Sequence, residues 1–354
     1  MPNPTCVKPN LDELMPLYSD ILTRSKLKQL LLAQGVTWYW RIFTPLMTLW
    51  GMIYQRLSDD KTSDAVISYF KSGAADAMDT QRSQRSPLSQ RFKSNSTSAY
   101  VQARNRLPVG VVVTCIRWVF QWVWSYAFDA NRPAAPSPAW HGRAVRLLDG
   151  TTYRMRPEGD WGAHYGQPKN QKGLSDWVVA KSVAAFCLDT RLCIGVTEGQ
   201  KTTSEPALAC ALIPKDPLPE SVYVGDRIFG VYRVAQVAHA HGHDLVVRLE
   251  VRTAQRLLRA SGKSPSPSSG TGVGVAWYPT SNTTVEPNLP KTPIVGRLGY
   301  VQCKNYGFRS IDLYLFTTLL DETAIPLADL FALYGLRWQV ELNYRDIKTT
   351  LDMA

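Results

Sequence analysis

Two acidic residues, Asp149 and Asp226, each follow a short run of β-type residues. Residues 144–148 (AVRLL) lead into Asp149, and residues 221–224 (SVYV) lead through a glycine into Asp226. Ligands of an α/β sheet bind outside the carboxyl ends of its strands, so we expect both carboxylates at that edge. A strand-end aspartate is also a common turn or helix-cap residue, so this pair alone is weak evidence for a site.

A third acid, Glu341, lies in a segment whose apolar periodicity predicts a helix over residues 326–351. Here Tyr334, Arg337, Glu341 and Lys348 follow the spacing Y-x2-R-x3-E-x6-K. At about 100° per residue the four side chains share one narrow stripe of a helix. The alternative is a surface ion pair between Arg337 and Glu341, worth a few tenths of a kcal/mol. That alternative leaves the shared stripe of Tyr334 and Lys348 unexplained.

Three carboxylates are the ligands that two-metal phosphoryl transfer needs. Two metal ions roughly 4 Å apart activate the attacking oxygen and stabilise the leaving oxygen. Mg²⁺ prefers oxygen ligands, and Mn²⁺ is a possible substitute. We therefore predict that Asp149, Asp226 and Glu341 are the catalytic, metal-binding residues, with no protein nucleophile.

The composition favours a globular protein with a polyanionic partner. The 354-residue chain is 45% hydrophobic, which excludes disorder along its whole length, and its length suggests two or three domains. The formal net charge is +11, which favours nucleic acid first and an anionic membrane surface second. A basic enzyme with neither partner is the alternative.

The sequence predicts a cytosolic protein without a structural metal or a membrane span. Its six cysteines include no C-x-x-C pair, and residues 1–12 lack a signal-peptide pattern. Two apolar stretches, residues 37–57 and 108–128, could be mistaken for spans. They contain Arg41 and Arg117, which are costly in a bilayer, so buried helices of a soluble domain are the better interpretation.

The N-terminal third is predicted to be a helical, basic, DNA-binding domain over residues 1–130. Leucines recur at helical spacing within residues 11–57. Residues 81–107 contain no acid and six cations: Arg82, Arg85, Arg91, Lys93, Arg104 and Arg106. Such a stretch is usually a solvated surface, but it also suits a phosphate backbone.

The rest of the chain is predicted to be an α/β domain with an insertion. Strand candidates at 178–188 and 192–197 and a helix at 231–241 place the first part of the core at residues 139–243. Residues 244–320 are expected to form a β-rich insertion. Its residues 261–296 include 22 Gly, Pro, Ser or Thr among 36, which predicts a long mobile loop. Residues 321–354 would supply the glutamate helix that completes the core.

Three segments resemble the acidic motifs of bacterial DDE insertion-sequence transposases. These are LLDGTTYRM (147–155), VYVGDRIFG (222–230) and LYGLRWQVELNYRDIKTTLDM (333–353). The spacing of the third is similar to that of the IS-four family, the branch with the Y-x2-R-x3-E-x6-K signature. Shorter resemblances at residues 41–45, 103–108 and 315–320 extend the likeness from about residue 38 to the end.

The resemblance implies a fold and a set of site residues. The fold would be an RNase H-like catalytic core, with a β-rich insertion between its second and third acids and a helical N-terminal domain before it. The metal-binding catalytic triad would be Asp149, Asp226 and Glu341. The residues that contact transposon-end DNA would be Tyr334, Arg337 and Lys348.

The resemblance also implies a reaction and partners. Such enzymes perform cut-and-paste transposition through strand nicking, an end hairpin and strand transfer. They bind double-stranded DNA, as terminal inverted repeats and as target, within a homodimeric complex. A bacterial cytoplasmic, nucleoid-associated location follows. Some stack a flipped base on a tryptophan of the insertion, and Trp277 is the one tryptophan within residues 244–320.

The C-terminus departs from the resembled proteins. The chain ends six residues after Lys348, whereas those proteins continue with further helices. The apolar positions Leu336, Val340 and Leu351 would then lack packing partners. A truncated, catalytically inactive DNA-binding remnant is therefore the alternative to an active transposase.

Overall fold

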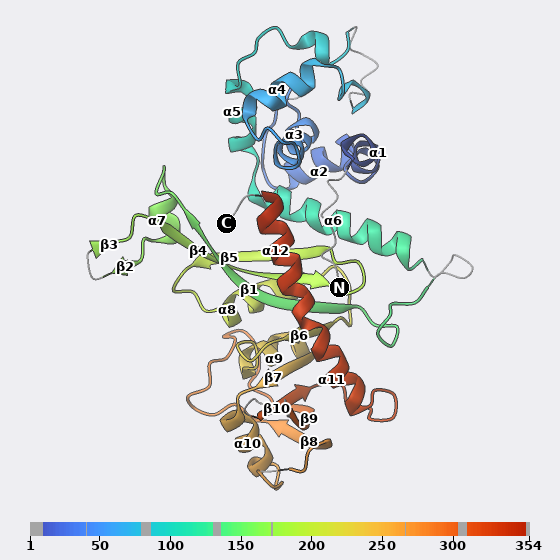
Figure 1. The fold of residues 1–354 in the computed structure, drawn as a ribbon, viewed down its shortest axis with the longest axis vertical. Coiled ribbons are helices and arrows are strands. Elements are labelled where there is room, and N and C mark those ends of the chain that lie inside the picture. Colours follow the sequence, from blue (N-terminus) through green and yellow to red (C-terminus); the bar gives the residue numbers. More distant parts are fainter. Residues whose placement is uncertain are drawn as a thin grey trace. The chain divides into compact units, whose positions relative to one another are not determined.

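The computed structural model describes residues 10–39, 41–78, 86–129, 136–170, 173–265, 267–303 and 310–351. The chain divides into two compact units, one of residues 1–122 with 346–353 and one of residues 123–345 with 354 (Figure 1). Two cations of the predicted basic stretch, Arg82 and Arg85, lie outside the described residues.

The first unit is built from helices. They are α1 (Leu11–Ile21), α2 (Arg24–Ala33), α3 (Pro45–Leu57), α4 (Ser63–Lys71), α5 (Ser98–Arg106) and most of α6 (Val109–Ala127), with short 3₁₀ helices at Asp76–Met78 and Ser89–Arg91. Side chains of Thr23, Thr44 and Thr62 accept backbone N–H groups at the starts of α2, α3 and α4, which stabilises those starts. The helices predicted within residues 11–57 are confirmed.

The apolar stretch at residues 108–128 forms α6, which buries Val111, Cys115 and Phe120. In the part of the chain that the structure describes, no single helix is long and apolar enough to cross a membrane. Only α5 and α6 taken together pass by length and composition, and they are bent by 80° at their junction.

The second unit is organised around a mixed sheet. Within the described residues, eight strands lie in the order β5-β4-β1-β6-β7-β10-β9-β8. Their bounds are β1 (Val145–Met155), β4 (Val178–Cys187), β5 (Cys193–Gln200), β6 (Val222–Gly225), β7 (Asp244–Leu249), β8 (Thr271–Trp277), β9 (Ile294–Cys303) and β10 (Ile311–Thr317). Strands β1, β6 and β7 are parallel, and the other pairs are antiparallel. The strands predicted at 178–188 and 192–197 are confirmed as β4 and β5.

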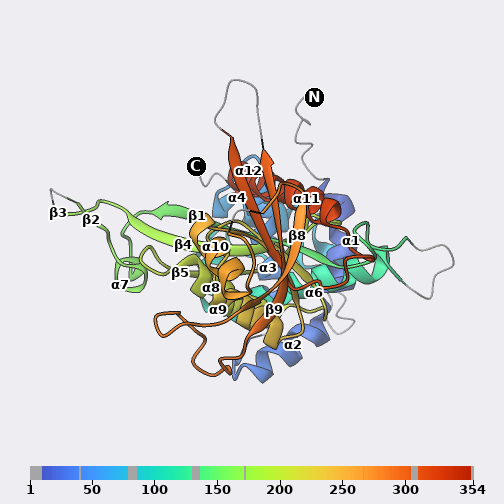
Figure 2. The same cartoon turned by 90° about the horizontal axis from the view of Figure 1, so that it is seen from below.

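Helices cover both faces of this sheet. Figure 2 shows α8 (Glu205–Leu212) and α9 (Tyr232–Ala240) on one side and α11 (Leu327–Gly335) on the other. Helix α9 matches the predicted helix at 231–241. The remaining elements are α7 (Trp161–Tyr165), the short β2 (Lys169–Asn170) and β3 (Gly173–Leu174), a 3₁₀ turn at Ile213–Lys215, and α10 (Val251–Ala260).

Residues 244–320 contain the expected strands, but these do not form a separate sheet. Strand β7 pairs in parallel with β6, and β10, β9 and β8 extend the same sheet outward from β7. The expectation of one uninterrupted loop over 261–296 is wrong, because β8 lies within it. Composition misled here, since all seven residues of β8 pair with β9, its two glycines included, despite the surrounding Gly, Pro, Ser and Thr.

The expectation of one continuous C-terminal helix over 326–351 is also wrong. Helix α11 ends at Gly335, a 3₁₀ turn covers Leu336–Trp338, and α12 (Gln339–Leu351) follows. Glycine is a poor helix former, and the break follows it directly. The expectation that Val340 lacks packing partners is wrong too, because its side chain is fully buried.

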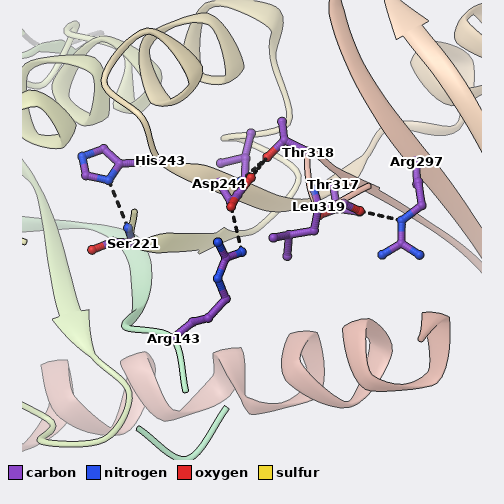
Figure 3. Close-up of polar contacts among 9 residues, drawn as sticks. Arg143, Ser221, His243, Asp244, Arg297, Thr317, Thr318 and Leu319 are labelled. Carbon is purple, nitrogen blue, oxygen red and sulfur yellow. Dashed lines mark hydrogen bonds and ion pairs between the residues drawn. The ribbon is translucent and has the colours of Figure 1, made fainter. Parts of the chain in front are cut away.

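A polar network fixes the amino ends of the parallel strands β6 and β7 (Figure 3). Arg143 donates to Asp244 at 2.9 Å, and the Thr318 hydroxyl donates to the other oxygen of Asp244 at 2.7 Å. The Ser221 N–H donates to Nδ1 of His243, and burial lowers the pKa of His243, which keeps this nitrogen an acceptor. The opposite, carboxyl end of β6 leads to Asp226.

Candidate active site at the carboxyl end of β6

Strand register makes Asp149 and Asp226 neighbours. Val145 pairs with Val222 and Leu147 pairs with Val224, a constant difference of 77 positions. Continued past the last pair, the same difference relates Asp149 on β1 to Asp226, the first residue after β6, and the charge of Asp226 acts on Asp149. This adjacency is what a shared ligand would require.

The prediction that Asp149 ends its strand is wrong, whereas Asp226 does follow the end of β6. Strand β1 continues to Met155, because β4 still supplies hydrogen-bond partners beyond the point where β6 stops. Asp226 begins a turn in which its Oδ1 accepts the N–H of Ile228 at 2.8 Å. Asp226 thus has the turn role that is common for such residues, and its second carboxylate oxygen does not take part in that turn bond.

The third acid, Glu341, comes from a segment far along the chain from the two aspartates. Glu341 lies in the first turn of α12, and its Oε1 accepts from Nη2 of Arg337 at 3.1 Å. The Glu341 side chain is 62% exposed and that of Arg337 only 20%. The i,i+4 ion pair considered from the sequence is therefore present, although Arg337 is more buried than a surface pair would be.

Arg337 lies among all three acids. Burial acts to lower the pKa of Arg337, but Tyr334, the hydrogen bond to Glu341 and the charges of Asp149 and Asp226 together raise it. Burial also raises the pKa of Tyr334. A cation held in this position offsets the mutual repulsion of the carboxylates.

Asp149 is held in an environment that disfavours its charge. Burial raises the pKa of Asp149 to about 6, the Gly150 N–H and Arg337 oppose this shift, and Asp226 and Glu341 add to it. Carboxylate oxygens that repel one another are suitable ligands for a divalent metal ion, because the charge of the ion relieves their repulsion. Among the described residues, however, no three His, Cys, Asp or Glu side chains are arranged closely enough to hold a metal ion. Binding by all three acids requires them to draw closer than they are here.

The family model for the transposase DDE domain matches residues 140–353. That range covers more than half of the 354-residue chain and contains all three acids. This chain belongs to the DDE transposase family. Membership indicates transposition by a DDE nuclease and implies a DNA substrate, and DDE transposases typically use divalent metals. No curated protein matches the sequence.

The sequence of this DDE transposase also points to Lys348 and Trp277. Lys348 lies seven residues beyond Glu341 on α12, in the part of the chain that belongs to the helical unit. Trp277 is 2% exposed and packs edge-on against Tyr232 and Phe316. In this arrangement Trp277 is a core residue and is not placed to stack a base.

Tyr344 is a site residue that the sequence did not reveal. Its hydroxyl donates to the Asp149 carbonyl at 2.9 Å and accepts from the Ala184 N–H at 3.0 Å. Asp149 and Ala184 are register partners on β1 and β4, so the hydroxyl bridges the two strands at the position of Asp149. Tyr344 lies three residues after Glu341, and it therefore ties the glutamate helix to the backbone of Asp149.

A fourth acid, Glu205, lies against the same strand. A methyl group on Gly150 would lie 2.4 Å from the Glu205 carboxyl group, so only glycine leaves room for that side chain. Burial raises the pKa of Glu205, Lys181 opposes the shift and Asp226 adds to it. In the sequence, Glu205 looks like an ordinary acid in the first turn of a helix, and only the packing of α8 on the sheet reveals its position.

Replacing Asp149 by Asn is expected to change how stability depends on pH in metal-free protein. The folded-state pKa of about 6 exceeds the ordinary value of 3.8, so the folded protein binds this proton more tightly than the unfolded chain. The wild type therefore loses stability as pH rises from about 4 to 6, and Asp149→Asn does not share that loss. Thermal midpoints are measured in a chelator at pH 4.5 and at pH 7. The midpoint of the variant relative to that of the wild type should be higher at pH 7 than at pH 4.5. A difference that stays constant would contradict the buried position of Asp149.

Proposed function

We propose that this chain is a Mg²⁺-dependent DNA transposase of the IS-four branch, with Mn²⁺ as a possible substitute ion. Asp149, Asp226 and Glu341 would hold the metal ions. The observation that carries the proposal is the grouping of the three acids around Arg337: Glu341 accepts a hydrogen bond from it, and the charges of Asp149 and Asp226 act on it.

The topology supports an RNase H-like core for this enzyme. In the run β5-β4-β1-β6-β7, three antiparallel strands are followed by two that are parallel to β1. We assign the core to residues 139–243 and 321–354. Residues 244–320 are assigned to the insertion, although its first strand, β7, is the last strand of the run β5-β4-β1-β6-β7. Residues 1–130 would be the DNA-recruiting domain, with Arg91, Lys93, Arg104 and Arg106 on its basic stretch.

The chemistry would be phosphoryl transfer at a DNA strand. Bound metal ions would activate the attacking oxygen and stabilise the leaving oxygen. Asp149 must be deprotonated to act as a ligand, and Arg337 favours that form. Tyr334, Arg337 and Lys348 would contact the DNA, and the arginine fork suits two phosphate oxygens. Tyr344 would fix the distance between Glu341 and the strand that carries Asp149.

The full reaction would be cut-and-paste transposition, through strand nicking, an end hairpin and strand transfer. The partners would be double-stranded DNA, both terminal inverted repeats and target, and a second copy of the chain in the DNA complex. Incubation of supercoiled plasmid with the full chain should give nicked product in Mg²⁺ and none in a chelator. DNA binding without any nicking in either metal would instead indicate a catalytically inactive remnant.

Arg337→Lys is expected to reduce cleavage while leaving the fold nearly unchanged. The variant keeps the charge, so a purely structural pair with Glu341 tolerates it at a cost below about 1 kcal/mol. It loses the planar fork that binds two phosphate oxygens, so nicking should fall about tenfold or more. The measurement is nicking rate beside the thermal midpoint, with Arg191→Lys as an exposed control. A lower midpoint with unchanged nicking per folded molecule would make Arg337 a structural residue.

A further inference from the structure

Helix α10 presents a row of arginines that the proposed catalytic residues do not use. Arg252, Arg256 and Arg259 are exposed, whereas Ala254, Leu257 and Leu258 are buried. At about 100° per residue the three arginines fall within a stripe about 60° wide. Figure 1 shows α10 beside β8 and β10 at the end of the sheet. The helix therefore buries one side against the sheet and turns a uniformly cationic side to solvent.

The nearest acid in the sequence is Glu250, which precedes the helix, and no acid follows within the helix or the segment after it. Residues 251–285 contain no Asp or Glu, and Lys263 adds a further exposed cation just beyond the helix. In the described part of the chain, the ion pairs of the second unit engage other arginines, such as Arg143 and Arg233, and none engages the α10 row. An uncompensated cationic face of this kind suits a polyanion.

A pocket of about 270 Å³ connects this face to the segments next to Glu205 and Asp226. Arg256 and Thr253 of α10 form one wall, and the pocket is also lined by Ser204 and Pro206, which flank Glu205. Its remaining wall includes Gly230–Arg233, which begins four residues after Asp226. The cationic face is thus contiguous with the two segments that bear Glu205 and Asp226.

The pocket itself is equipped for an anion. The first N–H groups of α9 adjoin it, and the helix start at Val231 has no side-chain cap. Trp277 lines the pocket, and its buried Nε1–H lacks a hydrogen-bond partner within the described residues. Buried donors are normally paired, so a bound acceptor is the expected complement.

We propose that the α10 face and this pocket bind the sugar-phosphate backbone of the DNA that is engaged at the active site. The proposal rests on the proposed transposase function and adds a surface that none of the acidic motifs includes. The three arginines span about 10 Å along the helix, and a duplex strand offers a phosphate about every 3.4 Å along its axis. The contacts are to phosphates, so binding here is independent of base sequence.

The test compares a triple variant, Arg252→Gln with Arg256→Gln and Arg259→Gln, with wild type in the full chain. Binding to a 40-base-pair duplex is measured in a chelator at several salt concentrations, so cleavage plays no part. Loss of three phosphate contacts should lower the salt slope by about 2–3, so the wild-type advantage shrinks about 40-fold from 50 to 200 mM salt. The loss should be equal for two unrelated duplex sequences, and Arg256→Gln should be the most damaging single change.

A matched control removes three exposed cations elsewhere in the same unit, with Arg191→Gln, Lys215→Gln and Lys291→Gln. All six replaced side chains are exposed, and glutamine is a good helix former on α10, so both variants should keep the wild-type thermal midpoint. An unchanged salt slope in the α10 variant, or an equal loss in the control, would overturn the proposal and leave the transposase function standing. A wild-type chain that binds neither duplex would instead overturn both.

Discussion

Asp226→Asn is expected to lower metal-dependent DNA nicking about 10³-fold or more, because losing a metal ligand removes several kcal/mol of transition-state stabilisation. The fold should persist. The asparagine amide oxygen can still accept the N–H of Ile228, so the turn after β6 keeps its hydrogen bond. The measurement is the initial rate of plasmid nicking in Mg²⁺, with duplex binding measured in parallel. Binding should change little, since the variant removes no cation.

Asp149→Asn and Glu341→Gln should lower the rate of metal-dependent nicking by a factor of the same order. Glu158→Gln is the matched control, since it neutralises an exposed carboxylate outside the cluster. Nicking at the wild-type rate by any of the three acid variants would remove that residue from the catalytic set. Equal loss in Glu158→Gln would show that overall charge, not metal ligation, limits the rate.

Tyr344→Phe is expected to destabilise the protein by about 2–4 kcal/mol, because two buried backbone groups lose their partner. These two groups are the Asp149 carbonyl and the Ala184 N–H, which both bond to the Tyr344 hydroxyl. The aromatic ring should keep its edge-on contact with Phe186, so no large cavity forms. Denaturant unfolding of wild type and variant gives this difference directly.

A positioning role for Tyr344 predicts a second effect beyond stability. Release of α12 from β1 loosens the distance between Glu341 and Asp149, so the turnover rate of fully folded variant should fall while DNA affinity stays constant. Tyr300→Phe is the control, since it removes one tyrosine hydrogen bond to Asp312 at the far part of the sheet. A destabilised Tyr344→Phe with unchanged turnover would reduce Tyr344 to a structural crosslink.

Local patterns were enough to find the elements that carry the acids. The valine-rich run before Asp226 predicts β6, because β-branched residues favour a buried strand. The spacing of Arg337 and Glu341 predicts their contact, because residues four apart meet on one helix face. Both inferences depend on residues close in sequence, where geometry is fixed by the backbone alone.

Features that depend on distant pairing were not predictable in the same way. The length of β1 beyond Asp149 depends on β4, which is some thirty residues away, and the sequence at Asp149-Gly150 looks like a turn. Tyr344 has the pattern of an ordinary core aromatic, and its bridge becomes visible only when α12 lies on the sheet. Glu205 is likewise revealed only by the close approach of α8 to Gly150.

The most direct test of the central claim is anomalous diffraction from crystals of the full chain with duplex DNA and Mn²⁺. The claim is that Asp149, Asp226 and Glu341 together hold the catalytic metal ions. It predicts anomalous peaks within about 2–2.5 Å of oxygens of all three carboxylates, and the loss of those peaks in Asp226→Asn. Peaks bound elsewhere, in a chain that still nicks DNA in Mn²⁺, would contradict it.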